Sequence, residues 1–378
     1  MRRTARNLPG VLPMLRRFRR RRYERAIAPF LAARDGRARR LPDGIVYEAT
    51  MRCNLRCEFC YVGELLNIEG QWRQELPIDM LRRAFPERKG LQVSLTGGEV
   101  FVRKDIEQVL DLFRAKRYTC GYLTTNGTLL DNERARALAR LAAAGFLRHV
   151  SISIDGPPPL HDAARGVTGT FARAAAGLRR LQAAATESGA PIRISVNTTI
   201  SADSLGALDR MADVAGELGV EAIGVNHLMF ATPGEVAETR RLLGDPRAEI
   251  ATFVTAQPGV NAEEVRVKIE ALAARCHSRG IHFDARPKVG NTAMEAYYSP
   301  GAPLAGRCLY PFLHARVGFS GKVYFCPFIR VEVGDLSQAP LEEIWNNETS
   351  ARLRRTLLEQ RLFPVCRRCC KVELERPC

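Results

Sequence analysis

The stretch "IVYEATMRCNLRCEFCYVG", residues 45–63, joins an apolar, strand-like run to three cysteines at Cys53, Cys57 and Cys60. The chain has 11 cysteines, and no secretory signal precedes this stretch, because the short apolar run "GVLPML" is followed at once by arginines. These features favour a reducing cytoplasm, where clustered cysteines bind metals more often than they form disulfides. The stretch therefore predicts a metal site beside the end of a strand.

Structural zinc is one interpretation of this site, and it needs four protein ligands. The next cysteine is Cys120 and the next histidine is His149, so the sequence offers no fourth ligand nearby. A cubane iron–sulfur cluster suits three thiolates better, since its fourth iron stays open for another ligand. An open iron is a place for chemistry on a bound molecule.

The spacing C-x3-C-x2-C, with Phe59 before the last cysteine, resembles the signature of radical S-adenosylmethionine (SAM) enzymes. The resemblance implies that Cys53, Cys57 and Cys60 hold a [4Fe–4S] cluster whose open iron chelates SAM. It also implies that SAM is cleaved reductively to a 5′-deoxyadenosyl radical, which abstracts hydrogen from an unactivated carbon. A flavodoxin- or ferredoxin-type protein is the expected reductant.

Further matches to the family follow the next strand-like runs. "LQVSLTGGEVF" (91–101) ends in glycines, which either let the backbone approach a ligand or simply form a tight turn. A guanidinium suits the carboxylate of SAM, although Arg165 could also be a solvated arginine on a helix. By resemblance to the GGE motif and to the family's strand ends, the residues expected to bind SAM are Gly97, Gly98, Glu99, Asn126, Ser153, Asp155 and Arg165.

Six strand-like runs alternate with amphipathic helix patterns in the middle of the chain. They are "IVYEAT", "LQVSLT", "CGYLTT", "HVSISI", "IRISVNTTI" and "EAIGVNHLMF". This alternation predicts an α/β fold with a parallel sheet, and six units predict a partial (β/α)6 barrel over residues 45–285. Ligands of such barrels lie at the carboxyl ends of the strands, where the cysteines, the GGE motif and Ser153 fall. Asn197 and Asn226 are expected at the same mouth.

A second group of cysteines lies beyond a predicted linker at residues 286–306. Two of them flank a predicted hairpin, "ARVGFSGKVYFC". A zinc ribbon-like site and a second iron–sulfur cluster both remain open from the residues alone. Residues 307–378 resemble the SPASM/twitch extension of radical SAM enzymes, which implies that one auxiliary [4Fe–4S] cluster is fully ligated by Cys308, Cys326, Cys366 and Cys369. Full SPASM domains carry two clusters and a further C-x2-C-x5-C-x3-C series, from which this chain departs, so one cluster is expected rather than two. Cys370 and Cys378 have no assigned role.

Residues 1–44 carry a net charge of +11 out of +16 for the whole chain. This arginine-rich segment has apolar residues at roughly helical spacing, which predicts a basic amphipathic helix. Such a helix could bind an anionic membrane surface, RNA phosphates or an acidic partner, or cap the barrel. We expect a cytoplasmic protein, peripheral to the inner face of the membrane if the helix binds lipid. The apolar positions are Leu12, Leu15, Phe18, Tyr23, Ile27, Phe30 and Leu31.

These features favour a radical SAM oxidoreductase with an auxiliary cluster. A closed cluster can accept or deliver an electron, so we expect oxidation, crosslinking or rearrangement of a natural-product, peptide or lipid precursor. The segment ahead of the barrel is too short for the leader-peptide recognition domain common in peptide-modifying members. This favours non-peptide substrates, although a separate protein could recognise the leader of a peptide substrate. The alternatives are a tRNA-modifying member of the superfamily and a non-enzymatic, zinc-stabilised protein that binds RNA or membranes.

Overall fold

The structure, a computed structural model, describes residues 28–30, 32–38, 40–255 and 258–374. Its main feature is a ten-stranded sheet in the order β13-β12-β11-β1-β2-β3-β4-β5-β6-β9. Each strand from β1 to β6 pairs in parallel with the next. The predicted partial (β/α)6 barrel is therefore confirmed. Its strands are β1 (Gly44–Glu48), β2 (Gln92–Thr96), β3 (Thr119–Thr125), β4 (His149–Ser153), β5 (Arg193–Thr199) and β6 (Ala222–Asn226).

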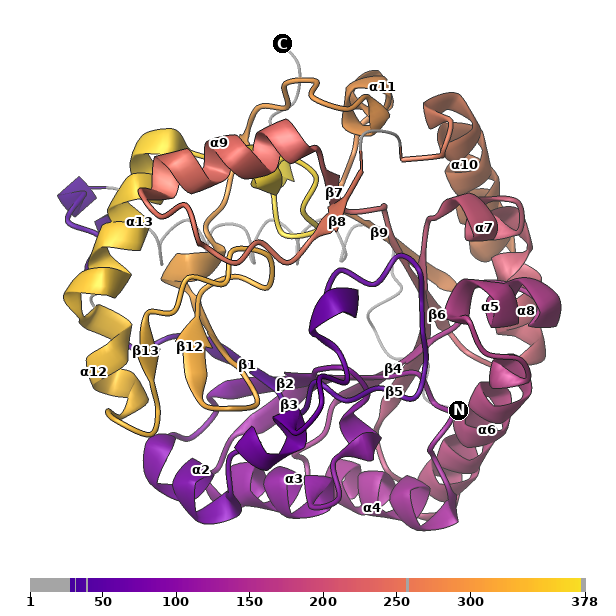
Figure 1. Ribbon diagram of the computed structural model, residues 1–378. Coiled ribbons are helices and arrows are strands. Elements are labelled where there is room, and N and C mark those ends of the chain that lie inside the picture. Colours follow the sequence, from indigo (N-terminus) through magenta and orange to yellow (C-terminus); the bar gives the residue numbers. More distant parts are fainter. Residues whose placement is uncertain (1–27, 31, 39, 256–257, 375–378) are drawn as a thin grey trace.

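Helices form a ring around the curved sheet and cover its outer face (Figure 1). In α4, the Asp131 side chain accepts a hydrogen bond from the Arg134 N–H at 2.9 Å, while Ala135, Leu138 and Leu141 form one buried face. An N-cap and an apolar stripe thus determine where this helix begins and which way it faces. The barrel helices are α2 (Ile78–Ala84), α3 (Ile106–Ala115), α4 (Asn132–Ala143), α5 (Pro158–Arg165), α6 (Thr170–Glu187), α7 (Ala202–Leu205), α8 (Met211–Glu217), α9 (Pro233–Leu243) and α10 (Ala262–Ser278).

The sheet continues beyond the predicted barrel on both sides. On one side β9 (His282–Arg286) pairs in parallel with β6, and on the other β11 (His314–Val317) pairs in parallel with β1. The predicted hairpin joins β11 to β12 (Lys322–Tyr324). The region of the second cysteine group thus shares its sheet with the barrel. The remaining elements are β7 (Phe230–Ala231), β8 (Phe253–Val254), β10 (Gly306–Arg307), β13 (Gly334–Asp335), β14 (Glu373–Leu374), α11 (Asn291–Tyr298), α12 (Leu341–Asn346) and α13 (Glu348–Gln360).

Residues 286–306 were expected to form a linker, but they contain helix α11. Tyr297 and Tyr298 are buried, and the Tyr297 hydroxyl donates hydrogen bonds to the carbonyls of Leu228 (3.1 Å) and Arg368 (3.0 Å). The two tyrosines therefore pack this Gly- and Pro-containing stretch between the barrel and the second cysteine group. Cys120 in β3 and Cys276 in α10 are fully buried and belong to the hydrophobic core.

The basic helix expected near the N-terminus lies almost wholly outside the described residues, as does Cys378. Of its apolar positions, the structure describes the side chain of Phe30, which is buried with its ring centroid 5.1 Å from that of Phe312. The Trp345 indole N–H donates to the carbonyl of Arg40 at 2.8 Å. The described N-terminal residues thus pack against the C-terminal region. In the part of the chain that the structure describes, every helix is too short or too polar to cross a membrane.

Candidate active site

Cys53, Cys57 and Cys60 lie in the loop after β1, at the carboxyl end of that strand. We call residues 49–62 the cysteine loop. The Leu55 N–H points at Cys53 Sγ at 3.5 Å. Burial raises the pKa of the Cys53 thiol to about 11 and also raises the pKa of Cys60. Thiols in such surroundings become thiolates when a cation binds them, so the donor set fits an iron–sulfur cluster.

Gly97 and Gly98 bring the end of β2 against the cysteine loop. The Gly98 N–H donates to the Thr50 carbonyl at 2.8 Å, and the Glu99 N–H donates to the Arg52 carbonyl at 2.9 Å. A Cβ at Gly98 would lie 2.3 Å from the Arg52 oxygen, and one at Gly97, where φ is +149°, would lie 2.2 Å from the Thr50 oxygen. Only glycine fits at these two positions. The GGE turn therefore positions the cysteine loop.

The Glu99 carboxylate is buried at the end of β3. It accepts hydrogen bonds from Thr125 Oγ1 (2.7 Å) and from the backbone N–H groups of Asn126 (2.6 Å) and Phe101 (3.2 Å). Burial raises the pKa of Glu99, although these hydrogen bonds act in the opposite direction. The Asn126 side-chain amide donates to Asn54 Oδ1 in the cysteine loop at 2.9 Å. A cationic partner, such as the amino group of SAM, would stabilise the charged form of a buried carboxylate of this kind.

Asp155 and Arg165 form a buried ion pair beside the cysteine loop. Arg165 Nε donates to Asp155 Oδ2 at 2.6 Å, and Arg165 Nη1 lies 3.5 Å from Cys57 Sγ. Burial alone would lower the pKa of Arg165, but the neighbouring Asp155 and Cys57 raise it. The side chain of Arg165 is buried, so the interpretation of a solvated helix arginine is wrong. Asp155 is fully buried and orients Arg165. The roles of both residues in SAM binding stay predictions.

Polar side chains cover the concave face of the sheet, while residues that alternate with them, such as Val150 and Ile152, are buried under the helices. His149 Nε2 lies 2.7 Å from Ser195 Oγ, and Tyr122 packs edge-on against His149. Burial raises the pKa of Tyr122, and the charge of Arg286 opposes this. We call these the lumen residues: Tyr122, His149, Ser151, Ser153, Ser195, Asn197, Asn226, Asp284 and Arg286.

The second cysteine group lines one cavity. Backbone N–H groups point at two of its sulfurs, from Phe328 to Cys326 Sγ at 3.3 Å and from Lys371 to Cys369 Sγ at 3.4 Å. Burial raises the pKa of Cys308 to about 12 and also raises that of Cys326. Four thiols that line one cavity, two of them with N–H groups directed at the sulfur, fit a fully ligated cluster. The cavity is lined by Cys308, Tyr310, Pro311, Phe325, Cys326, Pro327, Cys366, Cys369, Lys371 and Val372.

Neither cysteine group resembles a site for one metal ion. Among the described residues, no group of three or more His, Cys, Asp or Glu side chains is arranged to hold a single ion. A four-iron cluster needs a wider set of thiols, because each thiolate binds a different iron. The thiols of both cysteine groups fit four-iron clusters in this respect.

An aromatic contact joins the two cysteine groups. Tyr61 follows Cys60 in the cysteine loop, and its ring packs edge-on against Phe328, with centroids 5.2 Å apart. Phe328 is the residue whose N–H points at Cys326 Sγ. Two adjacent rings thus link a thiol of the first group to a thiol of the second.

A buried ion cluster lies where the barrel meets the region of the second cysteine group. Glu48, at the end of β1, accepts hydrogen bonds from Arg316 Nε at 2.7 Å and from two Arg330 nitrogens at 3.0 Å. Burial pushes the pKa of Glu48 upward, but the two guanidiniums more than offset this and hold it below its usual value. This cluster ties β1 of the barrel to β11 and to the loop after β12, and the sequence patterns gave no sign of it.

Cys370 is the residue beside Cys369 to which the sequence assigned no role. Its N–H donates to Met229 Sδ at 3.4 Å. A hydrogen bond with Cys369 and the charges of Lys371 and Arg286 hold its pKa below the usual value, although burial acts in the opposite direction. Cys369 lines the cavity of the second cysteine group, whereas Cys370 is not among the residues that line it.

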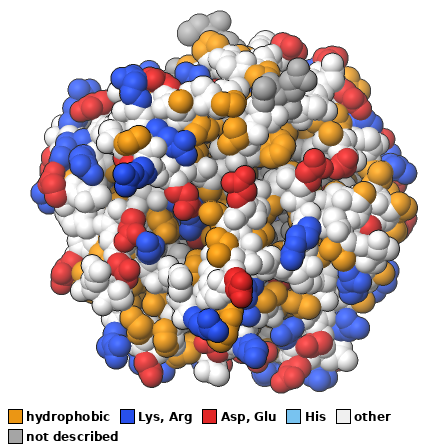
Figure 2. All heavy atoms as spheres, viewed as in Figure 1, with side chains coloured by type: hydrophobic (Ala, Val, Ile, Leu, Met, Phe, Trp, Pro, Cys, Tyr) orange, Lys and Arg blue, Asp and Glu red, His pale blue; other side chains and the backbone are white. Residues whose placement is uncertain are grey.

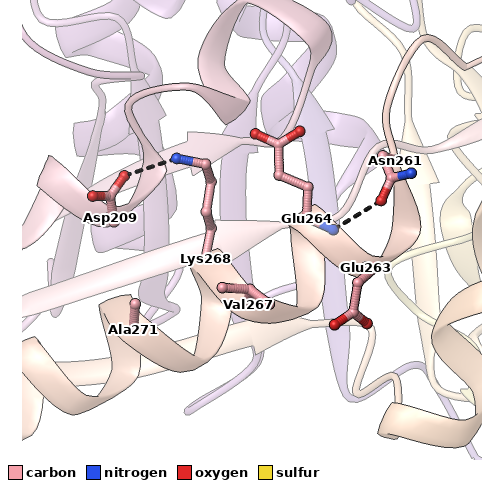
Figure 3. Close-up of a pocket in the computed structure, with 7 residues that line it drawn as sticks. All are labelled: Asp209, Asn261, Glu263, Glu264, Val267, Lys268 and Ala271. Carbon is pink, nitrogen blue, oxygen red and sulfur yellow. Dashed lines mark hydrogen bonds and ion pairs between the residues drawn. The ribbon is translucent and has the colours of Figure 1, made fainter.

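A further pocket lies on the outside of the barrel, beside α10 (Figure 3). Lys268 Nζ lies 3.2 Å from Asp209 Oδ1, and Asn261 Oδ1 accepts a hydrogen bond from the Glu264 N–H at 2.9 Å. These polar groups are already paired with one another, so we assign the pocket no role. It is lined by Asp209, Asn261, Glu263, Glu264, Val267, Lys268 and Ala271.

The fold and the two cysteine groups define an iron–sulfur enzyme that cleaves SAM, and comparison with known proteins agrees. The family model of the radical SAM superfamily matches residues 47–200. The model of the SPASM iron-sulfur cluster-binding domain matches residues 308–370. The chain belongs to the radical SAM superfamily and carries a SPASM domain; it is an enzyme that uses SAM and [4Fe–4S] clusters.

The chain is similar to enzymes with different substrates. It is 31% identical over 311 residues to the PqqA peptide cyclase of Streptomyces rochei, covering 80% of this chain and 75% of the relative. It is 29% identical over 325 residues to the AdoMet-dependent heme synthase of Methanosarcina barkeri, covering 83% and 85%. SuiB of Streptococcus suis bound to S-adenosylmethionine shares the fold, with a TM-score of 0.57, 17% identity and coverage of 83% and 68%.

Proposed function

We propose that this enzyme oxidises a peptide by abstracting hydrogen from an unactivated carbon and passing an electron to the auxiliary cluster. The observation that carries the oxidation is the pairing of a three-cysteine group and a four-cysteine group on one sheet. SAM bound at the first group supplies the 5′-deoxyadenosyl radical. The substrate radical then loses one electron and one proton, so the net change is a two-electron oxidation.

The SAM site of this proposal lies at the carboxyl ends of the barrel strands. Cys53, Cys57 and Cys60 would hold the cluster, and the buried carboxylate of Glu99 would supply the negative charge for the amino group of SAM. Arg165, held by Asp155, supplies the positive charge beside Cys57. The other SAM-binding positions are Gly97, Gly98, Asn126 and Ser153, and the auxiliary cluster is held by Cys308, Cys326, Cys366 and Cys369.

The lumen residues support a peptide as the substrate class. They offer hydroxyl, amide and charged groups in a row on the concave face, which suit the amide groups and carboxylates of a peptide. The similarity to a peptide cyclase agrees with this choice. On the face seen in Figure 2, acidic and basic side chains are interspersed, which is not the single-sign surface typical of tRNA binding.

The first test counts iron in anaerobically reconstituted protein. Wild type is expected to hold about eight irons, and a variant with Cys53, Cys57 and Cys60 all changed to alanine about four. Only wild type should release 5′-deoxyadenosine after dithionite reduction. Zinc in place of iron, or nucleoside release by the triple variant, would contradict the assignment of the two groups.

The second test identifies the substrate class by hydrogen transfer. Cells grown in deuterated medium are separated into peptide, tetrapyrrole and lipid fractions, and each fraction is incubated with enzyme, SAM and reductant. The proposal expects deuterium in 5′-deoxyadenosine with the peptide fraction. Transfer from the tetrapyrrole or lipid fraction alone would overturn the peptide assignment and leave the radical chemistry intact.

A further inference from the structure

Arg354 in α13 is a fully buried arginine with an unusual set of partners. Its Nε donates to the carbonyl of Pro311 at 2.9 Å, and its Nη1 donates to the carbonyls of Trp345 (2.8 Å) and Gly36 (3.3 Å). Its Nη2 is buried and has no hydrogen-bond partner among the described residues. The guanidinium also faces the rings of Trp345 and Phe325, at 4.1 and 4.3 Å from their centroids.

The other buried arginines differ from Arg354 in one respect. Within the described ranges six arginines are buried, and all of them except Arg354 form an ion pair with a carboxylate. Burying a cation without a counter-ion is costly. Burial alone lowers the pKa of Arg354 to about 9, which still leaves it charged at neutral pH. Its positive charge therefore lacks a compensating carboxylate in the described protein.

The position of Arg354 shows where compensation can come from. Two of its contacts, Pro311 and Phe325, line the cavity of the second cysteine group, and Phe325 directly precedes Cys326. The guanidinium thus lies one layer behind the thiols. A cluster held by four thiolates has a net negative charge, and its reduction adds one more negative charge.

We propose that Arg354 is the counter-charge of the auxiliary cluster and raises its reduction potential, which makes the cluster a better acceptor of the substrate's electron. This inference rests on the proposed ligation by Cys308, Cys326, Cys366 and Cys369. Arg354 touches neither substrate nor thiol and is a positioning residue that acts through its charge. The alternative is a purely structural role, in which Arg354 only holds α13 in position through its hydrogen bonds to the carbonyls of Pro311, Trp345 and Gly36.

The test measures the midpoint potential of the auxiliary cluster by redox titration followed by electron paramagnetic resonance. The triple alanine variant of Cys53, Cys57 and Cys60 serves as the background, so that only the auxiliary cluster is observed. Into it are introduced Arg354→Met and Arg354→Gln, which remove the charge, and Arg354→Lys, which keeps it. Arg103→Met is the matched control, because Arg103 is also buried but lies in the barrel and is paired with Asp105.

Loss of charge should lower the reduction equilibrium constant at least tenfold, a shift of about 59 mV for one electron. Arg354→Lys and Arg103→Met should stay within twofold of the background. A change below twofold in Arg354→Met and Arg354→Gln overturns the proposal. If the neutral variants lose iron while Arg354→Lys retains it, the charge is needed for cluster binding, which supports the proposal. If Arg354→Lys loses iron as well, Arg354 has only a structural role, which overturns the proposal. If the background variant itself lacks iron, the proposed ligation of the auxiliary cluster is wrong instead.

Discussion

At the residue scale, Gly98 shows how one missing side chain determines the site. Its neighbour Gly97 has a conformation that other residues rarely adopt, whereas Gly98 is required for space alone. The carbonyl of Arg52, 2.3 Å from the position of an added Cβ, belongs to the cysteine loop. A single methyl group at Gly98 therefore acts directly on the thiols that bind the first cluster.

We expect Gly98→Ala to lower the rate of 5′-deoxyadenosine release about 100-fold, because displacement of catalytic groups by about 1 Å has that effect. The auxiliary cluster should keep its iron. Gly206→Ala is the control, because an added Cβ there meets no atom within 4 Å and the backbone φ of −57° suits alanine. An unchanged rate in Gly98→Ala, measured with SAM and dithionite, would show that the contact is not needed.

At the element scale, the junction between β1 and β11 depends on Glu48. The variant Glu48→Gln leaves Arg316 buried without a carboxylate partner and leaves Arg330 only the partly exposed Glu249, at 2.7 Å, so the free energy of unfolding should fall by about 3–5 kcal/mol. The exposed ion pair of Lys322 with Glu332, at 2.8 Å, provides the control: Glu332→Gln should cost less than about 1 kcal/mol. Urea unfolding of the two variants measures both values, and equal costs would contradict a special role for the buried cluster.

The elements also show which features a sequence can reveal. The six barrel strands were predictable because alternating patterns and turn residues are local, and the first cysteine group was predictable because its spacing is local. The second group, from Cys308 to Cys369, could be assembled only through the resemblance to the SPASM/twitch extension. The contact of Arg165 with Cys57, the pairing of β11 with β1 and the added strand β9 were not, because each joins residues far apart in the chain. Helix α11 was missed because Gly and Pro flank its short apolar face.

At the scale of the whole molecule, one sheet carries both cysteine groups, so the distance between them is set by strand pairing. The cysteine loop follows β1, and Cys326 follows the hairpin that extends the sheet from β1 through β11. The described N-terminal residues add to this arrangement, since Gly36 and Arg40 contact Arg354 and Trp345 behind the second group. A fixed relation between two redox sites is what electron transfer from a substrate held between them requires.

The molecule as a whole should lose stability as the pH falls from about 6.5 toward 4. Burial lowers the pKa of His149, His161, His227 and His314 to about 4 in each case, against about 6.5 in an unfolded chain. Between these values the unfolded state binds protons that the folded state does not, so the free energy of unfolding decreases with falling pH and this contribution ends below about 4. Urea unfolding of anaerobic protein at pH 7.5, 6.5 and 5.5 measures the slope. His227→Gln, which removes one titrating group and keeps a hydrogen-bonding partner for Tyr298, should make that slope shallower; a stability independent of pH over this range would show that these histidines bind protons as readily in the folded protein as in the unfolded chain.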